Sequence, residues 1–123
     1  MKREIKFRVW DKENGCWASI DSVALCDDGS VAYLLPEEDD MPPYLEEDVE
    51  IMQYTGLKDN NGREVYEGDV VVVVSQYWGQ LGNRYEVKFR KGAFYAEYVL
   101  LSEISPSISV IGNVHENPEL WEE

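Results

Sequence analysis

The sequence predicts a mainly β fold, a β-rich α+β chain in which helix is a minor component. Several short segments alternate apolar and polar side chains, which is the period of a half-buried strand. Short turns rich in Asp, Asn and Gly separate these segments, as at Asp27-Asp28-Gly29 and Asp59-Asn60-Asn61-Gly62. No segment longer than about ten residues repeats its apolar side chains with the helical period.

The first part of the chain predicts two β-hairpins. Residues 3–11 alternate as a strand, residues 12–15 (KENG) form a turn, and residues 16–20 return as a second strand. Residues 22–35 make the second hairpin with the Asp-Gly pair at its tip, because such pairs accept the positive φ values of tight hairpin turns.

Residues 36–48 contain three prolines and seven acidic side chains. Proline removes a backbone donor and is not tolerated in a central strand, so this segment is predicted to be a loop. It is also the best candidate boundary, which gives an N-terminal β subdomain at 1–48 and a C-terminal part at 49–123.

The C-terminal part predicts at least five more strands. The five valines at 70–74 indicate a strand that is buried on both faces or curled as in a small barrel. Residues 84–90 and 93–100 form a hairpin with Tyr85, Val87 and Phe89 directed inward. Residues 108–117 form the last strand with a bulge at Gly112, and Asn117-Pro118-Glu119 begins a short terminal helix.

The charge of the chain excludes one large class of partners. It has 25 acidic and 11 basic residues, a net charge of −14. Non-specific nucleic-acid binding depends on Lys and Arg that neutralise phosphates, so we expect no direct nucleic-acid binding. The sequence has no apolar run of about 20 residues and no signal peptide, which predicts a cytoplasmic protein without a membrane partner.

No residues stand out for catalysis, cofactors or metal. Two cysteines and one histidine are too few for a structural zinc site, and Cys16 and Cys26 are interpreted as free thiols that fill apolar space. His115 has no local pattern that would pair it with a cysteine as a nucleophile. The Asp-rich turns do not match the EF-hand spacing. An enzyme of unrecognised type stays open only as a third alternative.

Aromatic residues suggest a contact surface instead. The chain has four Trp and eight Tyr, residue types that are enriched at interface hot spots. A candidate interaction surface consists of Tyr77, Trp78, Tyr95 and Tyr98. The alternative is that these side chains pack in the core or line its rim.

Three segments carry a resemblance to a known family. FRVWD at 7–11, MQYTGLKDNNGREVYEGDVV at 52–71 and VIGNVHENPEL at 110–120 together resemble the YopX family of phage and prophage proteins, from one end of the chain to the other. The principal motif positions are Trp10, Asp11, Tyr54, Thr55, Gly56, Asp59, Gly62, Tyr66, Glu67, Gly68, Asp69, Gly112, Asn113, Glu116 and Asn117.

The resemblance implies a phage or prophage origin, a C-terminal SH3-like barrel and a homo-oligomer, and it implies no activity. We therefore expect a phage-encoded, non-enzymatic binding module that acts through protein–protein contacts in the cytoplasm of a bacterial host. The alternative is an acidic nucleic-acid mimic that occupies a DNA-binding protein.

Overall fold

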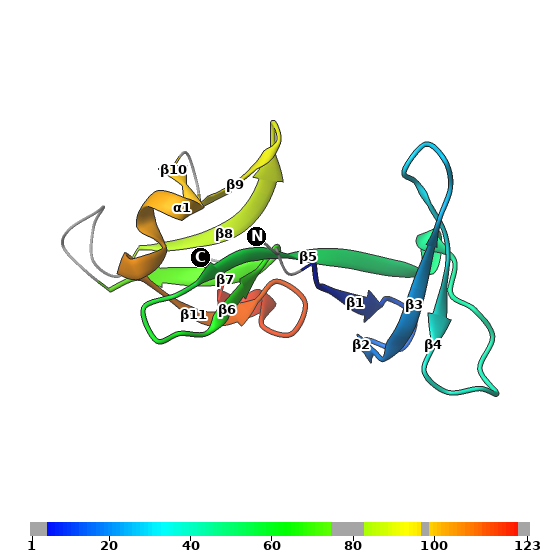
Figure 1. Cartoon of the computed structure of the whole chain (residues 1–123). Helices are drawn as coiled ribbons and strands as arrows, with labels where there is room; N and C mark the ends of the chain where they lie inside the picture. The colour runs from blue at the N-terminus through cyan, green and yellow to red at the C-terminus, as the bar shows by residue number, and fades with distance from the viewer. Residues whose placement is uncertain (1–4, 75–82, 97–98, 121–123) are drawn as a thin grey trace. The chain divides into compact units, whose positions relative to one another are not determined.

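A computed structural model describes residues 5–74, 83–96 and 99–120 of the chain (Figure 1). Strands predominate, which confirms the mainly β class, and the one α-helix of the described residues has four residues. The chain forms two compact units. The N-terminal unit is Phe7–Met52, and the C-terminal unit comprises the described residues of 1–6 and 53–123.

The N-terminal unit contains both predicted hairpins. Strand β1 (Phe7–Asp11) pairs antiparallel with β2 (Cys16–Ala18), and β3 (Ile20–Leu25) pairs antiparallel with β4 (Val31–Pro36). The tip of the second hairpin places Gly29 at φ +89°, a left-handed conformation that glycine adopts without steric cost.

The acidic segment after β4 adds no strand to a sheet. Tyr44 forms an isolated antiparallel bridge with Leu34, and Glu46–Asp48 makes one 3-10 turn, η1, before β5 (Val49–Lys58) begins. The core of this unit is small. It consists of Val9, Leu34 and Val49 with partly buried side chains packed around them.

The C-terminal unit is built on a five-stranded antiparallel sheet in the order β10-β9-β8-β7-β11. Four consecutive strands form a meander, and the last strand returns beside the first, which is the strand order of an SH3-like barrel. In chain order its elements are β6 (Glu64–Tyr66), β7 (Asp69–Val73), β8 (Arg84–Arg90), β9 (Ala93–Ala96), β10 (Val99–Leu100), α1 (Leu101–Ile104), η2 (Ser105–Ser107), β11 (Ile108–Asn113) and η3 (Pro118–Leu120).

The larger core lies in this C-terminal unit. Its buried side chains come from β6, β7, β8, β9, α1 and β11: Val65, Val71, Val73, Val87, Ala96, Leu101, Ile104, Ile108 and Val110. The helical turn α1 contributes Leu101 and Ile104. Strand β7 lies inside the sheet, since it pairs with both β8 and β11.

Two details of the predicted core are wrong. Val70, Val71 and Val73 are buried, but Val72 is only half-buried and Val74 is 42% exposed, because β7 ends at Val73. Phe89 is 49% exposed. It follows the buried Val87 on the same face, but it lies near the hairpin turn, where the core has ended.

The remaining predictions have mixed outcomes. The bulge at Gly112 is confirmed by a register shift between Val110 and Gly112. The terminal helix is a 3-10 turn, η3. Cys16 and Cys26 are free, as expected, but both are exposed, so their interpretation as core fillers is wrong. Within the described parts of the chain, no helix has the length and hydrophobicity to cross a bilayer.

Candidate interaction surface

The motif residue Asp59 closes a turn and ties it to a distant strand. One carboxylate oxygen, Oδ1, accepts hydrogen bonds from the backbone N–H groups of Asn61 and Arg63, each at 2.9 Å. The other, Oδ2, accepts from the backbone N–H of Val110 on β11, also at 2.9 Å. Asp59 is 6% exposed, so its negative charge is stabilised by three backbone dipoles in place of water.

The environment of Asp59 shifts its pKa. Burial alone would raise the pKa of the carboxyl, but hydrogen bonds from the backbone of Val110, Arg63 and Asn61 outweigh it, with help from the Arg63 charge. The net effect is a pKa below the ordinary value of an aspartate. The carboxylate is therefore ionised and structural rather than a proton donor at neutral pH.

Asp11 closes the first hairpin in a similar way. Its Oδ1 accepts from the backbone N–H groups of Glu13 and Asn14, and its Oδ2 accepts from the side chains of Asn14 at 2.8 Å and Tyr44 at 3.3 Å. The hydrogen bonds from Asn14 are the main reason that the pKa of Asp11 lies below its ordinary value. The proximity of this carboxylate contributes, after burial, to raising the pKa of Tyr44.

The other polar motif residues lie at strand boundaries, since Asp69 begins β7 and Asn113 ends β11. Oδ2 of Asp69 accepts from the backbone N–H of Tyr66 at 2.8 Å. Oδ1 of Asn113 accepts from the backbone N–H groups of His115 and Glu116, and its side-chain amide donates to Glu116 at 2.9 Å. Within the turn between Tyr66 and Asp69, Gly68 has φ +86°, where a side chain would be strained.

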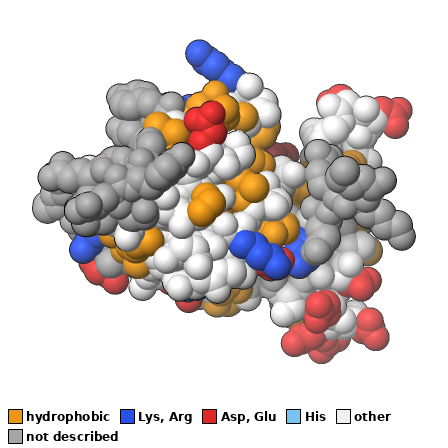
Figure 2. Space-filling model, turned by 60° about the vertical axis from the view of Figure 1, so that its left-hand side comes forward, with side chains coloured by type: hydrophobic (Ala, Val, Ile, Leu, Met, Phe, Trp, Pro, Cys, Tyr) orange, Lys and Arg blue, Asp and Glu red, His pale blue; other side chains and the backbone are white. Residues whose placement is uncertain are grey.

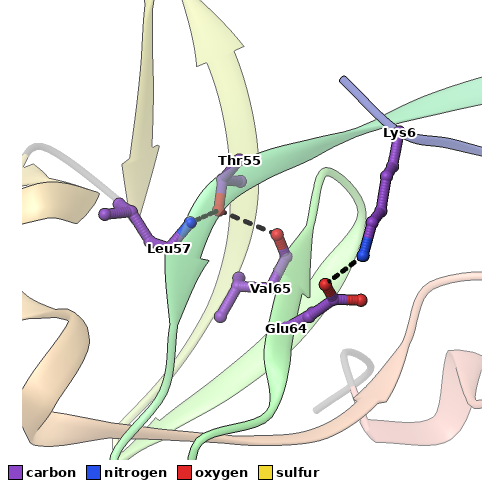
Figure 3. Close-up of polar contacts among 5 residues, drawn as sticks. All are labelled: Lys6, Thr55, Leu57, Glu64 and Val65. Atoms are coloured by element: carbon purple, nitrogen blue, oxygen red, sulfur yellow. Dashed lines mark hydrogen bonds and ion pairs between the residues drawn. The ribbon is translucent and has the colours of Figure 1, made fainter. Parts of the chain in front are cut away.

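The motif residue Thr55 on β5 belongs to a second polar group, which also includes residues of β6 and Lys6 from the segment before β1 (Figure 3). The hydroxyl of Thr55 donates to the carbonyl oxygen of Val65 at 2.8 Å and accepts from the backbone N–H of Leu57. Lys6 forms an ion pair with Glu64 at 2.6 Å. The register of β5 and β6 is thus held by side chains as well as by the backbone.

Tyrosines of the motif pack beside this ion pair. The ammonium of Lys6 lies 5.4 Å from the centre of the Tyr54 ring, and the Tyr54 and Tyr66 rings are 5.4 Å apart. Tyr54 is only 7% exposed. These aromatic residues therefore stabilise the pairing of β5 with β6 rather than offering a contact surface.

The predicted aromatic surface can be placed only in part. Tyr77, Trp78 and Tyr98 lie outside the described residues. Tyr95 lies on β9 opposite Lys88 of β8, is half-buried, and has the guanidinium of Arg90 5.1 Å from its ring centre. This arrangement places the described member of the set beside basic side chains.

A different surface stands out on the hairpin β3–β4. Tyr33 and Leu35 lie two residues apart and share the face opposite the buried Leu34, with exposed fractions of 42% and 38%. Their cross-strand partners are Ala24 and Ser22, which are too small to cover them. Their exposure follows directly from this pairing.

Exposed acidic side chains accompany this apolar face. We call the whole set the acidic hairpin surface. It consists of the exposed apolar residues Leu25, Tyr33 and Leu35 and the exposed acids Asp21, Asp27, Asp28, Glu37, Glu38, Asp39 and Asp40. Figure 2 shows acidic side chains gathered together at the lower right of the molecule. The sequence marked the acids, but the alternation in β4 alone did not show which face lacked a cover.

The two units differ sharply in charge. The N-terminal unit, residues 7–52, has thirteen acidic and two basic residues, a net charge of −11. The remainder of the chain has twelve acidic and nine basic residues, a net charge of −3. Within the described residues, no group of three or more His, Cys, Asp or Glu side chains is arranged to hold a metal ion.

Comparison with known proteins identifies the family. The family model described as YopX protein matches residues 6–122. A crystal structure of protein EF1440 from Enterococcus faecalis is similar with a TM-score of 0.71 and 28% sequence identity, over 98% of this chain and 100% of that one. No curated protein matches the chain. Because the family model spans nearly the whole sequence, the chain belongs to the YopX family.

Proposed function

We propose that this chain is a small phage-encoded, non-enzymatic binding module whose acidic hairpin surface receives a basic protein partner. The observation that carries the proposal is the exposed apolar pair Tyr33 and Leu35 on β4, in a hairpin that, with the loop after it, exposes seven acidic side chains. Exposed apolar side chains combined with charged ones are the composition of a protein-binding surface.

The charge of the N-terminal unit defines the partner. A surface with a net charge of −11 over 46 residues attracts a basic protein and repels acidic ones. The attraction speeds the encounter, and the apolar pair supplies affinity once the two proteins are in contact. A basic surface with one or two apolar side chains is therefore the complementary partner.

The polar motif residues support a role without catalysis. The carboxylates of Asp11 and Asp59 accept several hydrogen bonds each and hold turns. A general acid or base needs a pKa near the working pH, but the pKa of both groups lies below the ordinary value of an aspartate. The residues that define the family are used for folding.

A second candidate function is an acidic nucleic-acid mimic that occupies a DNA-binding protein. The exposed run Glu37–Asp40 and the acidic turn Glu46–Asp48 favour it. A mimic relies on charge and has no need for an apolar pair, so the exposure of Tyr33 and Leu35 favours the first proposal.

Capture from a bacterial host lysate with matched variants separates the two functions. We expect the double variant Tyr33→Ser with Leu35→Ser to lose the partner that the wild-type chain retains. Ile111→Ser, which changes a 38% exposed side chain of the C-terminal unit, should keep it. Duplex DNA added as a competitor should not release the partner.

A mimic gives the opposite pattern. Its partner would be released by duplex DNA, lost when Glu37–Asp40 are changed to Gln and Asn, and insensitive to the loss of Tyr33 and Leu35. A partner that survives every one of these changes would contradict both functions of the acidic hairpin surface.

A further inference from the structure

The C-terminal unit presents a surface opposite in character to the acidic hairpin surface. At the turn of β8–β9, Lys88, Arg90 and Lys91 are exposed, and Phe89, which lies on the other face of β8 from Lys88 and Arg90, is 49% exposed. We call these four residues the basic tip. Residues 84–96 carry four basic side chains and one acidic side chain, which makes this hairpin the most basic element after the N-terminus.

A tight turn and a cross-strand aromatic pair form the end of the hairpin at the basic tip. Lys91 has φ +50° and Gly92 has φ +81°, the pair of left-handed residues that a tight two-residue hairpin turn requires. Phe89 pairs with Phe94 across the strands, with ring centres 5.0 Å apart at an edge-to-face angle. The aromatic pair holds the hairpin end together and leaves part of Phe89 exposed for a contact.

We propose that the acidic hairpin surface of one copy of this chain receives the basic tip of a second copy. Lys88, Arg90 and Lys91 supply positive charges for the acids of β3–β4 and Glu37–Asp40, and Phe89 supplies an apolar side chain for Tyr33 and Leu35. Both sides of the contact are hairpins with exposed apolar side chains among charges of one sign.

The net charge of the chain determines when this contact forms. Two copies with a charge of −14 each repel at long range, but at physiological salt that repulsion is screened beyond about 8 Å. Opposite charges in direct contact are screened less, so the local match decides the outcome. The same charge excludes the symmetric alternative, in which two acidic hairpin surfaces would face each other.

The contact joins two different surfaces, so it is heterologous. Each copy offers one basic tip and one acidic hairpin surface, and repeated contacts therefore close into a ring or extend as a filament. The inference rests on the proposed function because it names an occupant of the same surface. It also implies that self-association and partner binding compete.

Sedimentation velocity of the purified full chain tests the contact. At physiological salt we expect the average mass to rise with concentration from the micromolar to the near-millimolar range, and to fall again at high salt. One variant reverses the tip with Lys88→Glu, Arg90→Glu and Lys91→Glu. A second reverses the loop with Glu37→Lys, Glu38→Lys, Asp39→Lys and Asp40→Lys.

Each variant alone should associate at least about tenfold more weakly than the wild-type chain, since like charges then meet at the contact. An equimolar mixture of the two variants should associate again, because each restores the opposite charge for the other. A control with Lys12→Glu and Lys58→Glu, two exposed bases outside the basic tip, should associate like the wild-type chain.

Three results would overturn the inference. They are a wild-type chain that stays monomeric throughout, reversed variants that associate as strongly as the wild type, and a mixture that fails to associate. A monomeric chain that still captures a partner through Tyr33 and Leu35 would leave the proposed function standing. Association without such capture would remove the proposed function but not the contact between copies.

Discussion

The two units of the chain use their residues in opposite ways. The C-terminal unit has nine buried side chains in one cluster, whereas the N-terminal unit has three. Six of the large apolar side chains of the N-terminal unit are exposed: Phe7, Leu25, Tyr33, Leu35, Met41 and Leu45. Among the described residues, the C-terminal unit has the larger core and five exposed large apolar side chains, whereas the shorter N-terminal unit has a small core and six.

Charge follows the same division. A net charge of −11 on 46 residues repels itself and lowers the stability of a compact unit, and the small core offers little to offset it. The C-terminal unit has a nearly balanced charge. The comparison teaches that stability is concentrated in the C-terminal unit, while the surface of the N-terminal unit is available for recognition.

The largest expected effect lies in the C-terminal core. Val71→Asp places an unpaired charge at a fully buried position in the interior strand β7, which should lower the free energy of unfolding by about 4 kcal/mol or more. Val74→Asp changes a 42% exposed valine just past the same strand and should cost less than about 1 kcal/mol. Urea unfolding of both variants measures the difference. Equal stability of the two variants would show that Val71 of β7 is not part of a buried core.

The next effect concerns Asp59, which links the turn after β5 to β11. Asp59→Asn keeps only one acceptor oxygen. In one orientation of the amide, its N–H₂ group faces the backbone N–H of Val110; in the other, it faces the backbone N–H groups of Asn61 and Arg63. A buried backbone donor without an acceptor should cost about 1–3 kcal/mol. The control is Asp28→Asn on the exposed N-terminal hairpin, where Oδ1 accepts from Ser30 and an amide oxygen can do the same. We therefore expect Asp59→Asn to have the lower melting temperature of the two variants. A lower melting temperature for Asp28→Asn would contradict this prediction.

The same carboxylate makes stability depend on pH. Since the pKa of Asp59 is lower in the folded chain than its ordinary value of 3.8, its contribution is complete above that value and is lost as the pH falls through the folded pKa. Asp11 acts in the same direction in the N-terminal unit. We expect wild-type stability to decrease below about pH 4 and Asp59→Asn to decrease less steeply. Parallel pH profiles for the two proteins would show that another group is responsible.

Local features of both units could be predicted from the sequence, and long-range ones could not. The Asp-Gly tip at Gly29 and the bulge at Gly112 depend on a few neighbouring residues, and both are confirmed. The bond from Val110 to Asp59 spans 51 positions and depends on the order of strands in the sheet. Alternation placed Phe89 on the inner face, but it carries no information on where the core ends.

The same limit applies to the candidate surface. The sequence marked the acidic segment 36–48, because composition is visible without a structure. It did not mark Tyr33 and Leu35, whose exposure depends on the register that sets them opposite Ala24 and Ser22. The motif residues could be recognised as family positions, but their role in turns required knowledge of which backbone donors lie within reach.

A smaller effect, on reactivity alone, is expected at the cysteines of the N-terminal unit. Cys16 and Cys26 are free and exposed, so a thiol reagent should modify both in the native chain at rates similar to those in urea. The modified protein should keep its melting temperature, since neither side chain belongs to the core. Mass spectrometry counts the modified thiols. A thiol that reacts only in urea would contradict the exposure of that cysteine. A disulfide bond between Cys16 and Cys26 would contradict their free state.

The smallest expected effect is none at all: the isolated chain should not shift random duplex DNA at physiological salt. Non-specific binding requires cations for several phosphates at once, and two of the N-terminal bases, Lys6 and Arg8, already have contacts within the chain. Lys6 pairs with Glu64 at 2.6 Å, and the Arg8 guanidinium lies 4.8 Å from the centre of the Trp17 ring.

The basic tip is the strongest local exception, since Lys88, Arg90 and Lys91 are exposed together. Three cations release few counterions, and the N-terminal unit adds a charge of −11 that repels the DNA at close approach. A salt-sensitive shift at low micromolar protein would show that one cluster outweighs this repulsion. Loss of the shift in Lys6→Glu with Arg8→Glu would assign it to the N-terminus, whereas loss in the tip-reversed variant would assign it to β8–β9. In either case the division of charge between the two units would not determine which partner the chain accepts.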